Sequence, residues 1–262
     1  MKKTIYLTLS ILLWACGGSS EDDSPIFDNF TVNVTAQKNT LVIDEVVTVA
    51  VTANKNISSI QVSTDNFATS QGAGTSSGLG TATTLYFNFD TVGTKTISIK
   101  VTNEAGTVVE KSVQLNVQRG TALKINSLKI LSFHNINQTW DPEFSSTDSN
   151  RLADVFFSLS KRNVHLTNGN LGSKLWIKSV IKQNQGDLTW NLTAYNLYID
   201  PNLSIWFGLA DDDGTFKQDL LMGPPFEREL KLSNFIATKP TTLRFTVPEI
   251  NLDLELNVEW PN

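Results

Sequence analysis

The chain has 262 residues, and its 26 acidic against 21 basic residues give a formal net charge of −5. This acidic balance argues against nucleic acid as a partner, because phosphate binding needs a basic footprint. A single cysteine excludes disulfides within the chain. The folded part must therefore rest on its own hydrophobic cores, and the length allows two domains.

The first fifteen residues have the features of a targeting segment. Lys2 and Lys3 precede an apolar run at 5–13, which is too short to span a bilayer and fits the hydrophobic region of a secretory signal. The run ends at Leu13-Trp14-Ala15-Cys16, which resembles a bacterial lipoprotein signal. The resemblance implies that Cys16 is acylated and becomes the first mature residue. A free thiol behind an ordinary signal peptide is the alternative.

Residues 16–26 form a small, polar and acidic tether with too little apolar surface to fold. It is similar to the acidic export signal that Bacteroidota lipoproteins carry behind the acylated cysteine. This implies an outer-membrane protein, anchored by its lipid and facing the cell exterior. The alternative is a flexible spacer that carries no export signal. Removal of residues 1–15, with two lysines and no acidic residue, leaves 19 basic against 26 acidic residues and a net charge of −7.

Residues 27–118 are expected to form an antiparallel β-sandwich. Apolar residues recur with period two at 32–34, 47–51, 97–101 and 113–117, which places them on one face of each strand. The stretch Phe89–Gly106 resembles the final hairpin of PKD-type immunoglobulin-like domains, and this implies the fold. The acidic signature of that family is missing, so no site is implied, and such domains usually act as spacers.

A short polar break at 118–121 separates this region from residues 121–262, which are expected to form a second sandwich. The predicted class is all-β, with two antiparallel sandwiches in tandem. Eight candidate strands lie in the second one, at 123–133, 154–160, 174–183, 188–197, 203–210, 228–232, 242–247 and 252–260.

The most distinctive stretch is 209–223, where Asp211, Asp213 and Asp219 follow an apolar run with the spacing D-x-D-x5-D. Carboxylates crowded on one loop raise one another's pKa unless a cation lies between them. Calcium, which takes six to eight oxygen ligands, suits such a loop. A plain Asp-Asp-Gly hairpin turn is the alternative, since Asp and Gly favour turns for backbone reasons.

The order of features in 123–262 is similar to a C2 domain, the calcium-dependent phospholipid-binding sandwich. The similarity lies in Trp140-Asp141-Pro142, Ala153-Asp154-Val155, Leu188–Leu192 and the 203–223 stretch. It implies an eight-stranded C2-like fold in which two loops at one end hold calcium. The implied ligands are Asp141 and Asp154 from the first loop and Asp211, Asp213 and Asp219 from the third, with Asp148 competing for the position of Asp141.

Trp140, Phe144 and Phe216 lie inside or beside the acidic loops. In the C2 family, apolar residues at the loop tips enter the lipid interface while calcium bridges to phosphate. The resemblance thus implies that these three aromatic residues contact a membrane or another partner. Packing of Trp140 and Phe144 beneath the first loop is the alternative.

Catalysis finds little support, because His134 and His165 lie in no metal-binding or nucleophile motif. We expect a non-enzymatic surface lipoprotein whose C2-like domain binds calcium and, through it, an anionic lipid or acidic glycan. One alternative is a spacer without metal. The other is a glycan-binding accessory lipoprotein of a polysaccharide-uptake system, with sugars stacked on Trp140, Trp176, Trp190 or Trp206.

Overall fold

The computed structural model describes residues 29–74 and 78–261. The predictions for the signal segment, the tether and Cys16 lie outside the described residues. Within the described part, no helix is long and apolar enough to cross a membrane.

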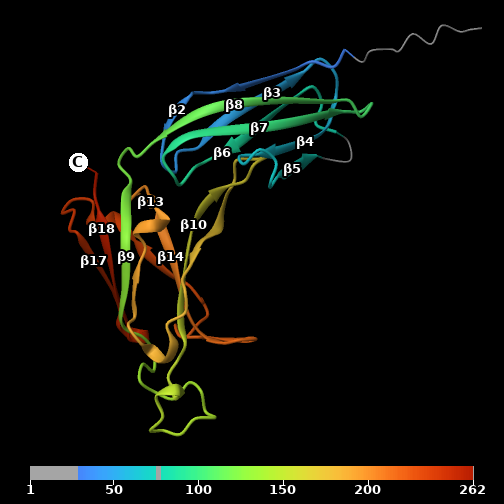
Figure 1. Cartoon of the computed structure of the whole chain (residues 1–262). Coiled ribbons are helices and arrows are strands. Elements are labelled where there is room, and N and C mark those ends of the chain that lie inside the picture. The colour runs from blue at the N-terminus through green and yellow to red at the C-terminus, as the bar shows by residue number, and fades with distance from the viewer. Residues whose placement is uncertain (1–28, 75–77, 262) are drawn as a thin grey trace, which may run out of the picture.

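The first eight strands form two facing sheets (Figure 1). One has the order β1-β3-β6 and the other β2-β8-β7-β4-β5, and every pairing is antiparallel except that of β2 with β8. Val47, Val49 and Val51 are fully buried, as the period-two pattern predicts. The strands are β1 (Val32–Ala36), β2 (Thr40–Val42), β3 (Val47–Ala53), β4 (Ile57–Ser63), β5 (Gln71–Gly74), β6 (Ala82–Phe87), β7 (Gly93–Asn103) and β8 (Val108–Gln118).

Ten further strands form two five-stranded antiparallel sheets, β11-β10-β14-β15 with β16 beside β14, and β12-β9-β18-β17 with β13 beside β9. The strands are β9 (Leu123–Ser132), β10 (Val155–Val164), β11 (Leu171–Lys178), β12 (Thr189–Asn191), β13 (Leu197–Ile199), β14 (Ser204–Asp213), β15 (Phe216–Asp219), β16 (Arg228–Lys231), β17 (Thr242–Val247) and β18 (Leu252–Glu259). Short 3-10 helices connect them: η1 (Ser149–Arg151), η2 (Gln183–Gln185), η3 (Thr193–Tyr195), η4 (Leu232–Phe235) and η5 (Pro248–Ile250).

The predicted all-β class, with two antiparallel sandwiches in tandem, is confirmed. The count of eight strands in the second sandwich is corrected to ten among the described residues. The segment expected as one strand at 188–197 is broken by η3 into β12 and β13, and a strand, β15, forms where a loop was expected. The limits 27–118 and 121–262 stay a prediction.

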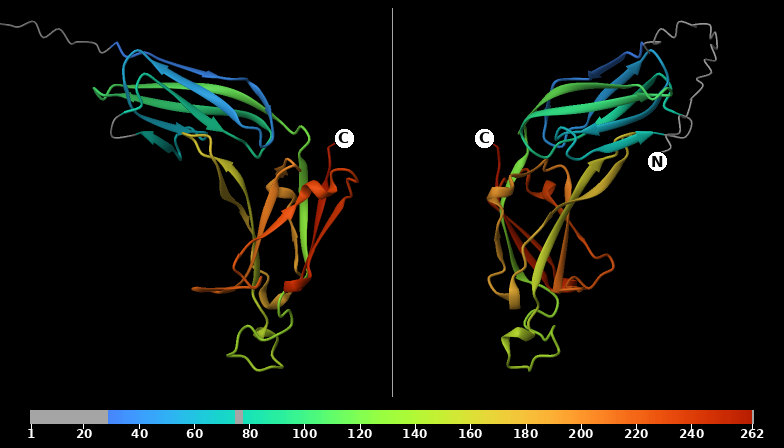
Figure 2. Two further views of the ribbon diagram at one scale, coloured as in Figure 1. Left: turned by 180° about the vertical axis from the view of Figure 1, so that it is seen from behind. Right: turned by 45° about the vertical axis from the view of Figure 1, so that its right-hand side comes forward.

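The first sandwich lies across one end of the second (Figure 2). The hairpin between β10 and β11 reaches up to β6, where the Tyr86 backbone N–H donates to Leu166 O (2.9 Å). Gly169 lies against the Tyr86 ring at φ +70°, and a Cβ there would come within 2.8 Å of that ring. The loop at 133–154 and the hairpin β14–β15 lie at the opposite end of the second sandwich.

Candidate metal centre

The alternation of β14 brings a carboxylate to the inner face of the second sandwich. Ile205, Phe207, Leu209 and Asp211 follow one another with period two, and all four are buried, Asp211 with no exposed surface at all. Asp211 lies between Val155 of β10 and Gln218 of β15 in the sheet. A charged group thus occupies the last inward position of a strand whose other inward residues build the core.

Beyond Asp211 the chain makes a tight hairpin instead of an open loop. Asp213 pairs with Phe216, which leaves Gly214 and Thr215 as the two turn residues, and Gly214 has φ +74°. Asp212 is on the outer face, where it pairs with Lys217. The alternative interpretation of this stretch as an Asp-Asp-Gly hairpin is therefore right about the backbone, while period two still leaves Asp211 and Asp213 on the same face.

The first loop carries a third carboxylate to this place. Trp140 packs against the core and donates through its indole N–H to Asn135 O (3.2 Å). The backbone N–H groups of Trp140 and Asp141 both donate to Arg151 O (2.8 and 3.2 Å), which closes the loop upon itself. Asp141 follows directly from the anchored tryptophan, and its position is fixed by these contacts.

Asp141, Asp211 and Asp213 form the acidic cluster, with one carboxylate oxygen of each within 4.8 Å of the others. Burial, together with the charges of Asp211 and Asp213, raises the pKa of Asp141 to about 6. Burial, reinforced by the charges of Asp213 and Asp154, raises the pKa of Asp211 to about 6. Asp211 Oδ1 accepts from the Asp154 backbone N–H (2.6 Å), whereas its buried Oδ2 has no hydrogen-bond partner among the described residues.

Two of the five predicted ligands lie beside the acidic cluster but turn their carboxylates elsewhere. Asp154 Oδ1 accepts from the Asn184 backbone N–H (2.8 Å). Asp219 pairs with Ala210 and so lies on the outer face, where its Oδ2 accepts from the Gly223 N–H (2.5 Å). Asp148, the competitor of Asp141, caps η1 by accepting from the Asn150 N–H (2.9 Å). The structure thus brings together Asp141, Asp211 and Asp213.

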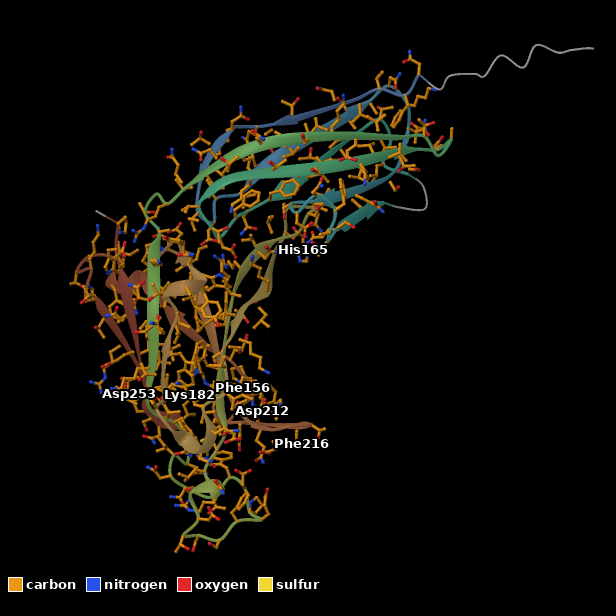
Figure 3. The ribbon with its side chains drawn as sticks, in the orientation of Figure 1. Phe156, His165, Lys182, Asp212, Phe216 and Asp253 are labelled. Carbon is orange, nitrogen blue, oxygen red and sulfur yellow. The ribbon has the colours of Figure 1, made fainter. Side chains whose placement is uncertain are left out.

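The three aromatic residues predicted for partner contact differ in exposure. Trp140 is partly buried against the core, which matches the alternative that it packs beneath the first loop. Phe216 is 70% exposed and Phe144 is 37% exposed. Phe216 projects from the end of the β14–β15 hairpin, away from the body of the sandwich (Figure 3). Two exposed phenylalanines therefore belong to the same two segments that supply the acidic cluster.

Three of the four tryptophans proposed as a sugar platform, Trp140, Trp176 and Trp190, pack against the core. Trp190 is buried and donates to Val180 O (2.8 Å), while its ring meets Phe157 edge-on. Trp176 is partly buried against the core with Lys161 Nζ 4.5 Å from its ring centre. Trp206 is also half-buried within β14. Trp176 and Trp190 therefore contribute to packing, whereas Trp206 lies on the outer face of β14 and lines a surface hollow.

The donor set of the acidic cluster fits a hard divalent cation. All the converging groups are carboxylate oxygens, which calcium and magnesium prefer, and nitrogen or sulfur ligands are absent from this cluster. The unpartnered Oδ2 of Asp211 is a buried acceptor that a cation would satisfy. Asp141, Asp211 and Asp213 would hold the ion, and its charge would offset their mutual repulsion.

The acidic cluster has one supporting contact that the resemblance to a C2 domain does not imply. Gln218 Nε2 donates to Asp213 Oδ2 (3.0 Å). Gln218 is directly opposite Asp211 in the hairpin, so its side chain shares the face of the acidic cluster. The two-residue turn and period two would have given this position from sequence.

No protein-family model matches the chain, and the search of curated proteins gave no match. Among solved structures, the chain is similar to the fibronectin(III)-like modules of Clostridium thermocellum CbhA, with 13% identity, a TM-score of 0.27, and coverage of 69% of this chain and 87% of that one.

A second similar structure comes from work on the promiscuous specificity of carbohydrate-binding modules of the β-sandwich superfamily (10% identity, TM-score 0.27, 89% and 98% covered). A third comes from work on host cell surface retention of a 1.5-MDa bacterial ice-binding adhesin (12% identity, TM-score 0.24, 73% and 64% covered). The fold described above rests on the strand pairings of this chain itself.

Proposed function

We propose that the second sandwich binds calcium through Asp141, Asp211 and Asp213, and that the ion mediates attachment to an anionic surface. Calcium takes six to eight oxygens, so three carboxylates leave positions for water or for oxygens of a partner. An ion held in this way has ligands on the protein and on the partner at once. The function is that of a binding module.

One observation carries this proposal: Asp211 is fully buried, its Oδ2 has no hydrogen-bond partner in the described part of the chain, and two further carboxylates lie within 4.8 Å. A buried charge without a partner is costly, and like charges beside it raise the cost. A fold that served only packing would be more stable with an apolar residue at this inward position of β14. A bound cation would offset the cost of burying the Asp211 carboxylate.

The surroundings of the acidic cluster support an anionic surface as the partner. Phe216 and Phe144 are exposed on the two segments that bear the cluster. Exposed aromatic rings beside a bound cation suit a lipid interface, because the rings enter its apolar boundary while the ion meets the phosphate groups. Anionic phospholipid is the probe that fits this chemistry.

Thermal unfolding of the full chain in calcium and in chelator tests the metal site. At about a hundredfold excess over the dissociation constant, one site adds about 2.7 kcal/mol to stability. This corresponds to a rise of several degrees in Tm. Asp211→Asn combined with Asp213→Asn should abolish the rise.

Asp212→Asn is the matched control, because Asp212 lies in the same hairpin but faces outward to Lys217. This variant should keep the full calcium response. A wild-type protein that melts identically in calcium and chelator would contradict the metal site, as would loss of the response in the Asp212 variant alone.

We also propose that the chain is held at the outer membrane by acylation of Cys16. The support is the apolar run at 5–13 that ends in the Leu-Trp-Ala-Cys sequence. In Cys16→Ser the protein should leave the membrane fraction. If the Cys16→Ser variant stayed in the membrane fraction, the lipid anchor would be refuted. Exposure at the cell surface has its own test: protease added to intact cells should cleave the native chain.

A further inference from the structure

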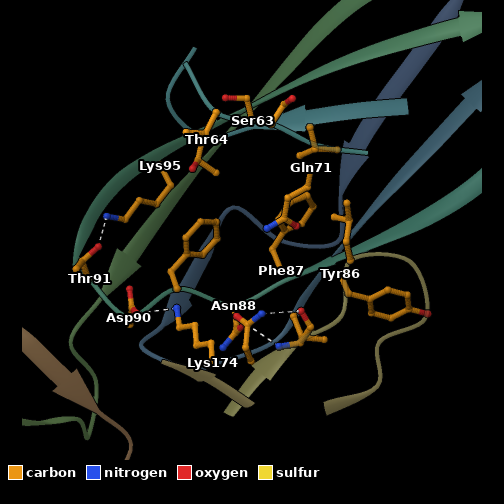
Figure 4. Close-up of a pocket in the computed structure, with 17 residues that line it drawn as sticks. Ser63, Thr64, Gln71, Tyr86, Phe87, Asn88, Asp90, Thr91, Lys95 and Lys174 are labelled. Atoms are coloured by element: carbon orange, nitrogen blue, oxygen red, sulfur yellow. Dashed lines mark hydrogen bonds and ion pairs between the residues drawn. The ribbon is translucent and has the colours of Figure 1, made fainter. Parts of the chain in front are cut away.

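A cavity of about 630 Å³ lies where β4–β7 of the first sandwich meet β10 and β11 of the second (Figure 4). Its size lies within the range of about 300–1,000 Å³ that is usual for small-molecule sites. The cavity is at the opposite end of the second sandwich from the acidic cluster, so it is a separate place in the molecule.

The walls of the cavity are held together by bonds between the two sandwiches. Lys174 of β11 forms an ion pair with Asp90 (2.8 Å). Asn88 Oδ1 accepts from the Val164 backbone N–H (3.1 Å). A site whose walls are already fixed loses less freedom when a ligand enters, which favours binding.

Two phenylalanine rings form an apolar surface in the cavity. Phe87 and Phe89 lie nearly parallel, with an interplanar angle of 7° and ring centres 6.5 Å apart. Both are only partly buried and line the cavity. The C–H face of a sugar ring packs well on such aromatic surfaces, because both are apolar.

Amide groups without partners lie around these rings. Within the described part of the chain, the side-chain amide of Gln71 has no hydrogen-bond partner. The Nδ2 of Asn88 likewise has no hydrogen-bond partner among the described residues, where only the Oδ1 of that side chain is bonded. Gln71 and Asn88 both border the hollow in Figure 4. An amide donates and accepts, which matches the hydroxyl groups of a saccharide.

The cavity also carries one positive charge that no carboxylate balances. Lys174 is paired with Asp90, whereas Lys95 Nζ donates to the Thr91 hydroxyl (2.6 Å) and has no acidic partner among the described residues. A single unpaired ammonium group favours a ligand with one negative charge per recognised unit. A carboxylate fits this better than a phosphate, which carries more charge.

We propose that this cavity binds an acidic oligosaccharide. A sugar ring packs on Phe87 and Phe89, its hydroxyls bond to Gln71 and Asn88, and the carboxylate of a uronic acid unit meets Lys95. The site is built from both sandwiches, since Lys174 and Val164 hold its walls from the second one. It is independent of calcium.

Binding of oligogalacturonate and of hyaluronan oligosaccharides to the full chain, measured by calorimetry in chelator, tests the proposal. At least one acidic oligosaccharide should bind, and the methyl-esterified oligogalacturonate, which keeps the rings but lacks the charge, should bind about tenfold more weakly. Absence of binding by both acidic probes would overturn the proposal. Equal binding of the esterified probe would overturn the role of the carboxylate.

Lys95→Gln should weaken binding by about tenfold while the Tm stays unchanged. Lys111→Gln is the matched control, because Lys111 is an exposed lysine on β8 away from the cavity, and it should bind as wild type. Equal affinity of these two variants would contradict the site. The Asp211→Asn, Asp213→Asn variant should keep saccharide binding, so failure of the metal site and failure of this site are separate results.

Discussion

Asp44 and Lys161 form a buried ion pair across the junction of the two sandwiches, with 2.6 Å between Oδ1 and Nζ and side chains 1% and 0% exposed. Asp44 Oδ2 also accepts from the Asp200 backbone N–H (3.1 Å), and Lys161 donates to Tyr198 O (3.3 Å). Burial raises the pKa of Asp44 and lowers the pKa of Lys161, against the attraction between them. Each charge therefore depends on the other to remain buried.

Removal of one partner should destabilise the protein strongly. Lys161→Met leaves Asp44 buried without its cation, and we expect a loss of about 3–5 kcal/mol in the free energy of unfolding. The double variant Asp44→Asn, Lys161→Met should recover most of that loss, since neither charge remains. Urea unfolding followed by tryptophan fluorescence measures both.

The exposed ion pair of Arg244 with Asp253 provides the control. Arg244→Gln should cost less than about 1 kcal/mol, because water screens this pair. Should the Lys161 variant be as mild as the Arg244 variant, the buried pair would contribute little to the junction.

Asp219 provides a test of which carboxylates bind calcium. Its side chain lies on the outer face of the hairpin and bonds to Gly223, so Asp219→Asn should keep the rise in Tm caused by calcium. Asp141→Asn should weaken calcium binding about tenfold or more, because it removes a ligand charge from the acidic cluster. Calcium titration of both variants decides this, and the reverse ranking would favour the five-ligand arrangement expected from the D-x-D-x5-D spacing.

The sequence indicates which aspartates lie near the acidic cluster better than it indicates where their carboxylate groups point. The D-x-D-x5-D stretch contributes Asp211 and Asp213 to the acidic cluster, and the first loop contributes Asp141. The error at Asp219 has a physical reason: a two-residue turn makes 211–219 a paired hairpin, in which period two decides the face. Asp154 lies beside Asp211, to which its backbone N–H donates, but its own Oδ1 accepts from the Asn184 backbone N–H.

The sequence alone does not predict the contacts between the two sandwiches. The candidate strand at 154–160 ends one residue before Lys161, and nothing in the local sequence shows that a residue from the other sandwich will cover this side chain. Asp44 stands in a turn at φ +64° and meets Lys161 only once both sandwiches have formed. The stretch 68–82, rich in Gly, Ser and Thr, predicts a loop, yet β5 forms within it, because pairing with β4 rests on backbone hydrogen bonds and not on strand propensity. Tertiary contacts decide both features.

The raised pKa values predict how stability depends on pH without calcium. Asp141 and Asp211 have pKa values of about 6, so the folded protein keeps protons that the unfolded chain loses from about pH 4. In chelator, stability should therefore fall as pH rises from about 4 to 6, relative to Asp211→Asn with Asp213→Asn, by about 2 kcal/mol. Urea midpoints across this range measure the difference, and parallel profiles of the two proteins would show that burial and the neighbouring charges do not raise these pKa values.

The exposed ring at the hairpin tip gives the last prediction. Phe216 is 70% exposed beside Asp213, and we expect its side chain to enter the interface of an anionic membrane when calcium is bound. Phe216→Ala should weaken calcium-dependent binding to phosphatidylserine vesicles by about tenfold or more, since burial of a phenylalanine contributes about 1.5–3 kcal/mol. Calcium affinity without vesicles should stay unchanged, because Phe216 supplies no ligand.

Phe226 serves as the matched control. It is 64% exposed but lies in the segment before β16, outside the two segments that bear the acidic cluster. Phe226→Ala should bind the vesicles as wild type does in a sedimentation assay with calcium, and neither protein should bind in chelator. Equal losses in the Phe216 and Phe226 variants would show that apolar exposure in general drives vesicle binding. Full binding by the Phe216 variant would show that the hairpin tip does not meet the membrane, and calcium would then have to act through a partner that needs no apolar contact.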